Sequence, residues 1–170
     1  MIQYNIINEE NKHVFDIYFK WKELNRLIKQ NYTRGVNLHE YITETLCCIL
    51  NGYTLHAGTG NSEDAITSDG KKVQVKATSN FNKDLTSFGP KSEFDILEFL
   101  RLDEEQDLIY CYRLDGKHLE SMKLNKKQTF KQIQLAGKRP RLSIINELII
   151  EEKCTPYAKI DMKTGIVTYY

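Results

Sequence analysis

A segment in the middle of the chain carries the residue types most suited to chemistry. Asp64 lies at its start, and Gln74 and Lys76 follow further along. Alternate side chains of a β-strand share a face, so Gln74, Lys76 and Thr78 are expected to point the same way. A carboxylate can bind a divalent cation, and a lysine ammonium can stabilise negative charge that develops in a transition state. These residue types are therefore suited to binding a metal ion and stabilising developing negative charge.

A β-hairpin is the element that must bring these side chains together. Residues 64–67 and 72–78 are predicted strands, and Ser-Asp-Gly-Lys at 68–71 separates them. Asp-Gly between two β-type runs is a strong signal for a tight turn. The other face of the second strand is then expected to be buried in a core through Val73, Val75 and Ala77.

Two helices are predicted before the hairpin. Residues 11–30 place apolar side chains at steps of three and four, as an amphipathic helix does. A second helix is expected at 37–50, with Asn37 as its N-cap and Gly52 in a left-handed conformation after its end. A short strand is expected at 53–56.

The rest of the chain alternates between strand and helix patterns. We expect strands at 94–102 and 108–114, a basic helix or loop at about 125–137, a helix at 142–151 and a hairpin in the tail. No repeat or interdomain linker interrupts residues 1–170. The prediction is a single α/β domain, with a mixed central β-sheet flanked by helices.

Composition restricts the class of protein. The chain has 170 residues, with 41% hydrophobic and 28% charged content, which is typical of a soluble globular domain. No apolar run approaches the roughly 20 residues that cross a bilayer, so no membrane partner is expected. The N-terminus has no signal-peptide pattern, which favours a cytoplasmic location. The four cysteines lack CxxC pairing and are expected to be buried free thiols.

Positive charge is concentrated in one region. Residues 111–141 hold nine Lys or Arg and two acidic residues, a net charge of +7 in a chain whose total is +1. Such asymmetry suggests a face that binds a polyanion, although a solvated basic helix would give the same counts.

The central motif resembles that of the PD-(D/E)XK nuclease superfamily. In that superfamily a helix carries a Glu, an Asp begins a strand, and the second strand of the hairpin carries (Asp/Glu)-x-Lys. The corresponding residues occur here in the same order: Glu40, Asp64, Gln74, Val75 and Lys76. Gly52-Tyr53 matches the start of the strand that follows the helix, so the resemblance covers roughly residues 37–80.

The string TSFGPKSEFD at 86–95 resembles a small group of bacterial Type II restriction endonucleases that cut GCNGC sites. This resemblance implies a restriction-endonuclease-like fold, with a catalytic core at about 37–115. The implied activity is sequence-specific hydrolysis of phosphodiester bonds in double-stranded DNA with Mg²⁺, for which Mn²⁺ would substitute. It also implies a cognate DNA methyltransferase as functional partner.

The resemblance assigns roles to the motif residues. Lys76 would orient or activate the attacking water and stabilise the charged transition state. Asp64 would be the central metal ligand, and the other expected ligands are Glu40, the Gln74 amide oxygen and the Val75 carbonyl.

Gln74 departs from the commoner pattern, because an amide is an uncharged and weaker ligand than a carboxylate. Some active restriction enzymes of the superfamily carry Gln here, by resemblance. The departure raises the importance of Glu40, for which Glu44, one helical turn later, is the alternative.

The basic region at about 113–141 is the expected DNA-recognition region. Six cations are expected mostly to anchor phosphates, with one or two reading bases: Lys126, Lys127, Lys131, Lys138, Arg139 and Arg141. Four residues on or after the catalytic strand are further candidates for DNA contact: Thr78, Ser87, Lys91 and Ser92. A domain this small that cuts both strands of a symmetric site is expected to be a homodimer.

Three alternatives remain open from the residues themselves. A DNA repair or junction-resolving nuclease shares the same catalytic core. A DNA-binding module with an inactive relic site would explain Gln74, and an interaction protein with an incidental basic face would explain the charge. The recognition sequence, the stagger of the cut and the number of metal ions are also open.

Overall fold

The hairpin expected at 64–78 lies within a larger mixed sheet. The computed structural model describes residues 1–56 and 62–170. Its main sheet has eight strands, and only the contact between β4 and β6 is parallel. In spatial order they are β1 (Ile2–Asn5), β10 (Ile166–Tyr169), β9 (Ala158–Asp161), β7 (Leu108–Asp115), β6 (Ile96–Asp103), β4 (Lys72–Thr78), β3 (Ala65–Ile66) and β2 (Thr54–Leu55). The α/β prediction is confirmed.

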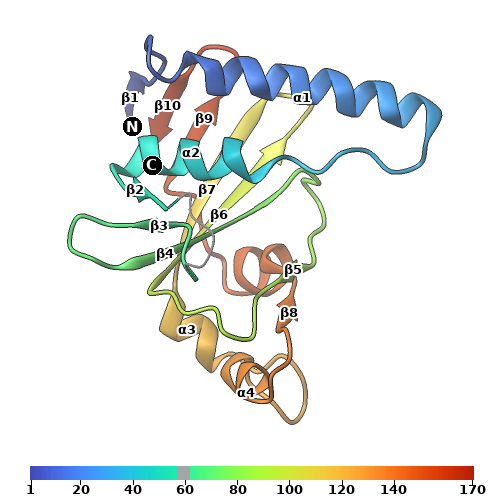
Figure 1. Ribbon diagram of the computed structural model, residues 1–170, viewed down its shortest axis with the longest axis vertical. Coiled ribbons are helices and arrows are strands. Elements are labelled where there is room, and N and C mark those ends of the chain that lie inside the picture. Colours follow the sequence, from blue (N-terminus) through green and yellow to red (C-terminus); the bar gives the residue numbers. More distant parts are fainter. Residues whose placement is uncertain (57–61) are drawn as a thin grey trace.

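Helices cover both faces of this sheet (Figure 1). Helices α1 (Lys12–Asn31) and α2 (Glu40–Asn51) pack with one face into a core that contains Val14, Ile42 and Val75. A second core on the other face contains Leu97, Phe99 and Phe130. The elements of that side are β5 (Thr86–Ser87), α3 (Gly116–Ser121), α4 (Phe130–Leu135), β8 (Arg141–Leu142) and the π-helix η1 (Ile145–Glu151).

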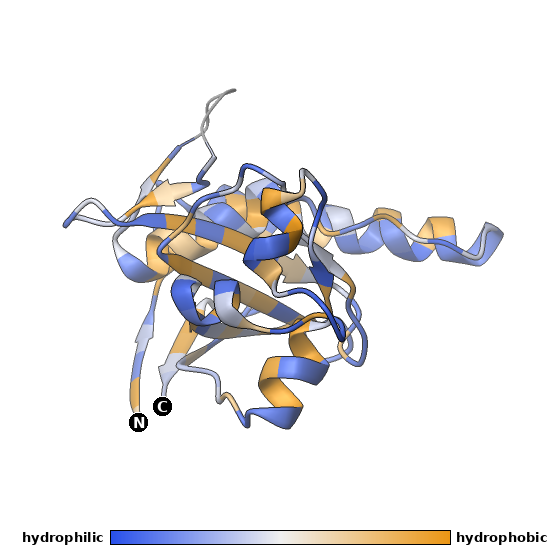
Figure 2. Ribbon diagram, turned by 90° about the horizontal axis from the view of Figure 1, so that it is seen from below, coloured by the Kyte–Doolittle hydropathy of each residue, from blue (hydrophilic) through white to orange (hydrophobic). Residues whose placement is uncertain are grey.

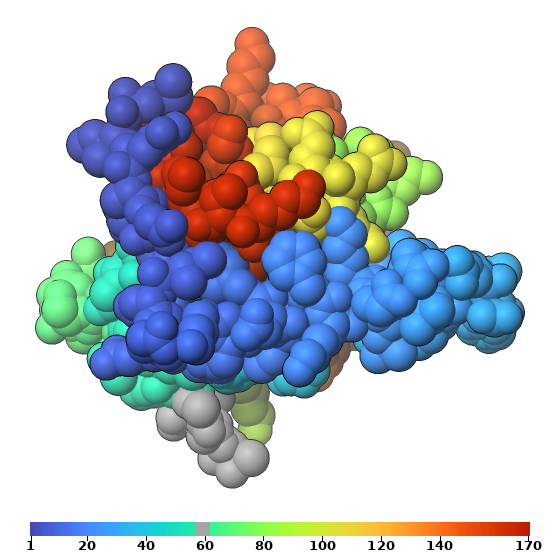
Figure 3. Space-filling model, turned by 90° about the horizontal axis from the view of Figure 1, so that it is seen from above, coloured from blue at the N-terminus to red at the C-terminus, as the bar shows by residue number. Residues whose placement is uncertain are grey.

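Hydrophobic residues follow this layered arrangement. Figure 2 shows apolar residues along the strands between the two helical layers, whereas α1 alternates between apolar and polar positions. The far end of α1 projects beyond the rest of the molecule (Figure 3). None of the helices among the described residues is long and apolar enough to span a membrane.

Helix α2 begins later than expected. Its N-cap is His39, whose Nδ1 accepts a hydrogen bond from the Tyr41 N–H at 3.1 Å. The prediction of Asn37 as N-cap was wrong, because the Asn37 carbonyl accepts instead from the Trp21 indole at 3.0 Å and residue 37 stays outside the helix. The predicted end is confirmed at Gly52, which has a φ of 65°.

The hairpin forms with the expected alternation. Strand β3 pairs antiparallel with β4, and Gly70 in the turn has a φ of 85°. Val73 and Val75 are buried as predicted, but Ala77 is exposed. Strand β3 pairs only with the start of β4 and does not extend to Ala77, which lines a pocket.

Most other elements match their predictions. Helix α1, strands β2, β6 and β7 and the closing hairpin β9–β10 are confirmed. The expected helix at 142–151 is the π-helix η1, and the basic helix or loop expected at 125–137 contains the short helix α4. Strand β1 and helix α3 were not predicted. The cysteines are free thiols, three of them buried and Cys154 half-buried.

Candidate active site

The motif residues meet in one pocket of about 540 Å³. Its walls come from the start of α2, the residue before β3, strand β4 and the segment 84–87. Each residue predicted to act in catalysis or metal binding lines it: Glu40, Asp64, Gln74, Val75 and Lys76. Glu44, the alternative helix carboxylate, lines it too. The fold therefore brings the predicted residues together.

Asp64 is held in place by the hairpin. Its backbone N–H donates to the Val73 carbonyl at 2.9 Å, which fixes the residue beside β4. Its Oδ2 accepts from the Val75 N–H at 2.7 Å and from Gln74 Nε2. Burial raises the pKa of Asp64, while the bonds from Val75 and Gln74 and the charge of Lys76 oppose that rise.

Gln74 bridges two partners inside the protein. It is buried, at 6% exposed, and its Nε2 faces Asp64. Its Oε1 accepts from the Ser92 hydroxyl at 3.2 Å. The amide thus presents its nitrogen to the carboxylate, and its oxygen, the expected metal ligand, is engaged by Ser92.

Lys76 is available for charge stabilisation. Within the described part of the chain it forms no ion pair within 4.0 Å. Its Nζ lies 5.6 Å from the centre of the Phe88 ring, a cation–π contact that supports the stem. A half-buried, unpaired ammonium beside Asp64 can meet a negatively charged group that enters the pocket.

The two helix carboxylates differ in environment. Glu40 is exposed at the first residue of α2, and Glu44 is half-buried one turn later. Burial, together with the charges of Asp64 and Glu40, raises the pKa of Glu44 to about 7, against the opposing effect of Lys76. Three carboxylates that repel one another in a pocket are typical of a site that binds a cation.

Comparison with known proteins settles the family. Residues 6–151 match the family model described as Bsp6I restriction endonuclease. The chain is also 42% identical over 149 residues to the Type II restriction enzyme Bsp6I of Bacillus sp. (strain RFL6), covering 86% of this chain and 85% of that protein. The chain belongs to the Bsp6I restriction endonuclease family. It is a Type II restriction endonuclease, a hydrolase that cuts double-stranded DNA at specific sites, and this class uses divalent metal ions. The predicted resemblance is confirmed.

The donors of this family member fit a hard divalent cation. Among residues 1–56 and 62–170, no three His, Cys, Asp or Glu side chains converge into a preformed metal cluster. Mg²⁺ does not need one, since it is commonly bound by one or two carboxylates together with waters and substrate phosphates. The Val75 N–H and C=O share one side of β4, so its carbonyl lies on the side of Asp64.

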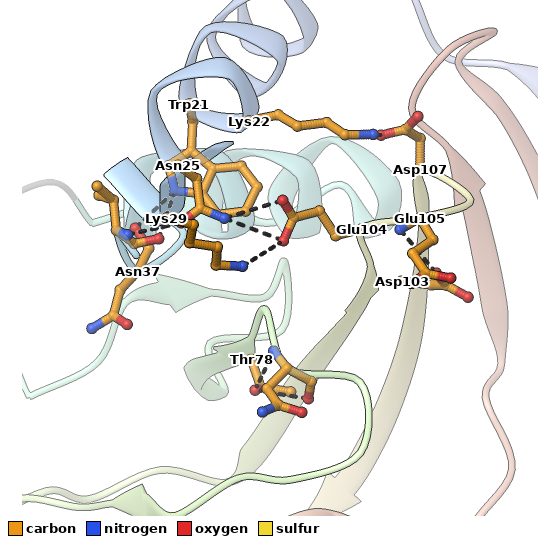
Figure 4. Close-up of polar contacts among 12 residues, drawn as sticks. Trp21, Lys22, Asn25, Lys29, Asn37, Thr78, Asp103, Glu104, Glu105 and Asp107 are labelled. Atoms are coloured by element: carbon orange, nitrogen blue, oxygen red, sulfur yellow. Dashed lines mark hydrogen bonds and ion pairs between the residues drawn. The ribbon is translucent and has the colours of Figure 1, made fainter. Parts of the chain in front are cut away.

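The segment before α2 is fastened by a buried amide. Asn25, 2% exposed, accepts from the Val36 N–H at 2.8 Å and donates to Glu104 at 3.1 Å. Figure 4 shows this contact beside the ion pair between Lys22 and Asp107, 2.5 Å apart. The adjoining pocket of about 1010 Å³ is larger than the catalytic one, but two of its cations, Lys22 and Lys29, are paired with acidic residues of the protein. This network fixes Val36, four residues before Glu40.

Two of the predicted DNA-contact residues line the catalytic pocket, Thr78 and Ser87. Ser87 pairs with Arg141 between β5 and β8, so the basic region reaches the pocket rim. Lys91 is exposed, and Ser92 points to Gln74. Four of the remaining predicted cations are exposed: Lys126, Lys127, Lys138 and Arg139. Lys131 is half-buried and pairs with Glu120 at 3.0 Å.

Sequence reasoning missed two acidic residues that matter for the structure of the site. Asp84 lines the pocket, yet its oxygens accept from Ser143 and from the N–H groups of Ile144 and Ile145 at the start of η1. Ser143 before an apolar run was the available signal for a helix start. Glu98, fully buried, binds Arg113 at 2.6 Å, and no local pattern pointed to it.

Proposed function

We propose that this restriction endonuclease cleaves DNA with Mg²⁺ at the pocket of Asp64, as a homodimer that cuts both strands. The observation that carries the proposal is the meeting of Asp64, Glu40 and Lys76 in one pocket, where neither of these two carboxylates forms an ion pair with a described residue. Mn²⁺ would substitute for Mg²⁺, since both are hard cations that bind carboxylate and carbonyl oxygens.

Each side chain has a role that follows from its position. Asp64, Glu40 and the Val75 carbonyl would hold the cation, with Glu44 as the competing helix ligand. When bound, the ion would lower the pKa of a coordinated water and neutralise charge on the phosphate. Lys76 stabilises the extra negative charge of the phosphate during attack and orients the water. Gln74 restrains Asp64 through its Nε2.

DNA would lie across the pocket and the basic region at 113–141. The pairing of Ser87 with Arg141 joins these two surfaces. Exposed lysines and arginines beyond it would anchor phosphates, and Thr78 at the pocket rim would contact the backbone near the cut. Affinity for DNA should therefore fall steeply as the salt concentration rises.

Two-fold symmetric DNA sites match two-fold symmetric proteins, which supports the homodimer. Free cysteines are typical of a reducing compartment and support a cytoplasmic location. A cognate methyltransferase would protect host DNA in the same compartment.

The direct test is digestion of a defined, unmethylated plasmid with Mg²⁺, followed by sequencing of the cut ends. We expect discrete fragments whose ends share one short sequence, with GCNGC expected from the resemblance. Lys76→Ala should abolish cleavage and retain DNA binding. Cleavage of branched or mismatched DNA alone would favour a repair nuclease, and binding without metal-dependent cleavage would favour a relic site.

A further inference from the structure

A continuous hydrogen-bonded chain joins helix α4 to Asp64. Gln134 Nε2, on α4, donates to the carbonyls of Gly89 at 2.9 Å and Ser92 at 3.0 Å. The Ser92 hydroxyl donates to Gln74 Oε1 at 3.2 Å, and Gln74 Nε2 donates to Asp64 Oδ2. Residues far apart in the sequence therefore connect the basic region to the central carboxylate of the active site.

Burial makes this series of hydrogen bonds a fixed part of the protein. Gln134 is 5% exposed and Gln74 is 6% exposed. Gln134 Oε1 is buried and has no hydrogen-bond partner among the described residues, so the polar contacts of this side chain are the two bonds that its Nε2 donates. An apolar side chain of similar length would fill this position without leaving an acceptor unsatisfied.

An aromatic contact runs parallel to the polar one. Phe88 packs edge-on against Phe130 of α4, with ring centres 5.1 Å apart, and it stacks on Phe94. The same Phe88 ring lies 5.6 Å from Lys76 Nζ. The loop 88–94 thus contacts α4 on one side and both Gln74 and Lys76 on the other.

We propose that Gln134, Ser92 and Gln74 are positioning residues that orient the Asp64 carboxylate. The inference rests on the proposed function. An amide at position 74 can donate to Asp64 while it accepts from Ser92, whereas an ionised carboxylate there would repel Asp64. The neutral Gln74 is in this account a restraint on Asp64 rather than a weak metal ligand.

The first test replaces the two outer members of the chain, with Ser92→Ala and Gln134→Met. We expect the single-turnover cleavage rate at saturating DNA to fall about 10- to 100-fold, the usual effect of removing a partner that orients a metal ligand. The dissociation constant for cognate DNA, measured with Ca²⁺ in place of Mg²⁺, should change less than about threefold. Ser92→Thr keeps the hydroxyl and should restore most of the rate.

Matched controls are Ser68→Ala and Gln106→Met, which change the same residue types at exposed positions outside both the pocket and the basic region. Both should cleave like the wild type. Cleavage by the wild type separates the two proposals: if the wild type cuts no DNA, the proposed function fails, whereas normal cleavage by Ser92→Ala overturns only the positioning proposal.

The second test distinguishes a restraint from a metal ligand at position 74. Gln74→Glu should lower the cleavage rate and should not tighten Mg²⁺ binding, measured by calorimetry in a Lys76→Ala background that does not turn over. Tighter Mg²⁺ binding with retained cleavage would overturn the proposal. An equal loss of DNA affinity and rate in Ser92→Ala would also overturn it, because Ser92 would then act as a direct DNA contact.

Discussion

Two carboxylates flank Val75, the half-buried Asp64 and the fully buried Glu98, and the protein gives them different partners. Asp64 accepts the Val75 N–H, and Glu98 is the register partner of Val75 on β6. Glu98 is fully buried and binds Arg113 at 2.6 Å, and the hydroxyls of Tyr53 and Tyr157 donate to it at 3.0 Å each. Asp64 opens into a pocket that Glu40 and Glu44 also line.

Burial raises the pKa of both groups, so the difference lies in their partners. The protein itself supplies a cation and two hydroxyls to Glu98, which makes that carboxylate a structural group that joins β6, β7 and the segment before β9. Around Asp64 it supplies two hydrogen bonds, the charge of Lys76 without a direct ion pair among the described residues, and the opposing negative charge of Glu40. An incompletely neutralised carboxylate in a pocket is suited to a ligand that brings positive charge.

The largest effect should come from Lys76→Ala. Loss of the ammonium removes a group that stabilises transition-state charge, and the cleavage rate should fall by about 10²- to 10³-fold or more. Single-turnover digestion of plasmid DNA measures it, with Lys20→Ala on exposed α1 as control. A rate within threefold of the wild type would remove Lys76 from the mechanism.

Arg113→Met tests the structural role of Glu98. It leaves the fully buried Glu98 without its cation, and the free energy of unfolding should fall by about 3 kcal/mol. Urea denaturation measures the change. Arg26→Met breaks the exposed pair with Glu23 and should cost less than about 1 kcal/mol. Equal losses in the two variants would contradict the assigned role of Glu98.

Glu40→Gln and Glu44→Gln test which helix carboxylate binds the metal ion. Removing the helix ligand should slow cleavage about 10- to 100-fold and raise the Mg²⁺ concentration needed for half-maximal rate. We expect this for Glu40→Gln, with a smaller effect for Glu44→Gln. Mg²⁺ titrations of the cleavage rate decide it, and the reverse order would transfer the ligand role to Glu44.

The smallest effect is a pH dependence of stability without metal. The pKa of Glu44 rises from its ordinary value near 4.5 to about 7 in the folded protein, chiefly by burial and then by the charges of Asp64 and Glu40. The folded state therefore holds a proton that the unfolded chain has released, and the stability from Glu44 is lost as the pH rises towards 7. Urea unfolding at pH 5 and pH 8 should show a difference that Glu44→Gln reduces. An unchanged difference would contradict the raised pKa.

Local signals were enough to find the hairpin and its chemistry. Asp-Gly at the turn, alternation along β4 and the order of Asp64, Gln74 and Lys76 are all short-range features, and the structure places these residues in one pocket. The pairing of Ser87 with Arg141 was not predictable, because it depends on how segments far apart in the sequence pack.

The contacts that explain Gln74 and Glu98 were hidden for the same reason. Ser92 reaches Gln74 only because the loop after β5 folds back over β4, and Glu98 meets Arg113 through the register of β6 and β7. In the sequence Glu98 was one acidic residue in an apolar run. A register between strands is a global property, and no local pattern of charges specifies it.

The role of Asp64 as the central metal ligand is tested most directly by urea unfolding of the wild type and Asp64→Asn, with and without Mg²⁺ at matched ionic strength. Without metal, Asp64→Asn should be at least as stable as the wild type, because the pKa of Asp64 is raised in the folded protein and its charged form is therefore disfavoured there. At a tenfold excess of Mg²⁺ over its dissociation constant, the wild type should gain about 1.4 kcal/mol and Asp64→Asn should gain nothing. An equal gain in both proteins would contradict Asp64 as the central metal ligand.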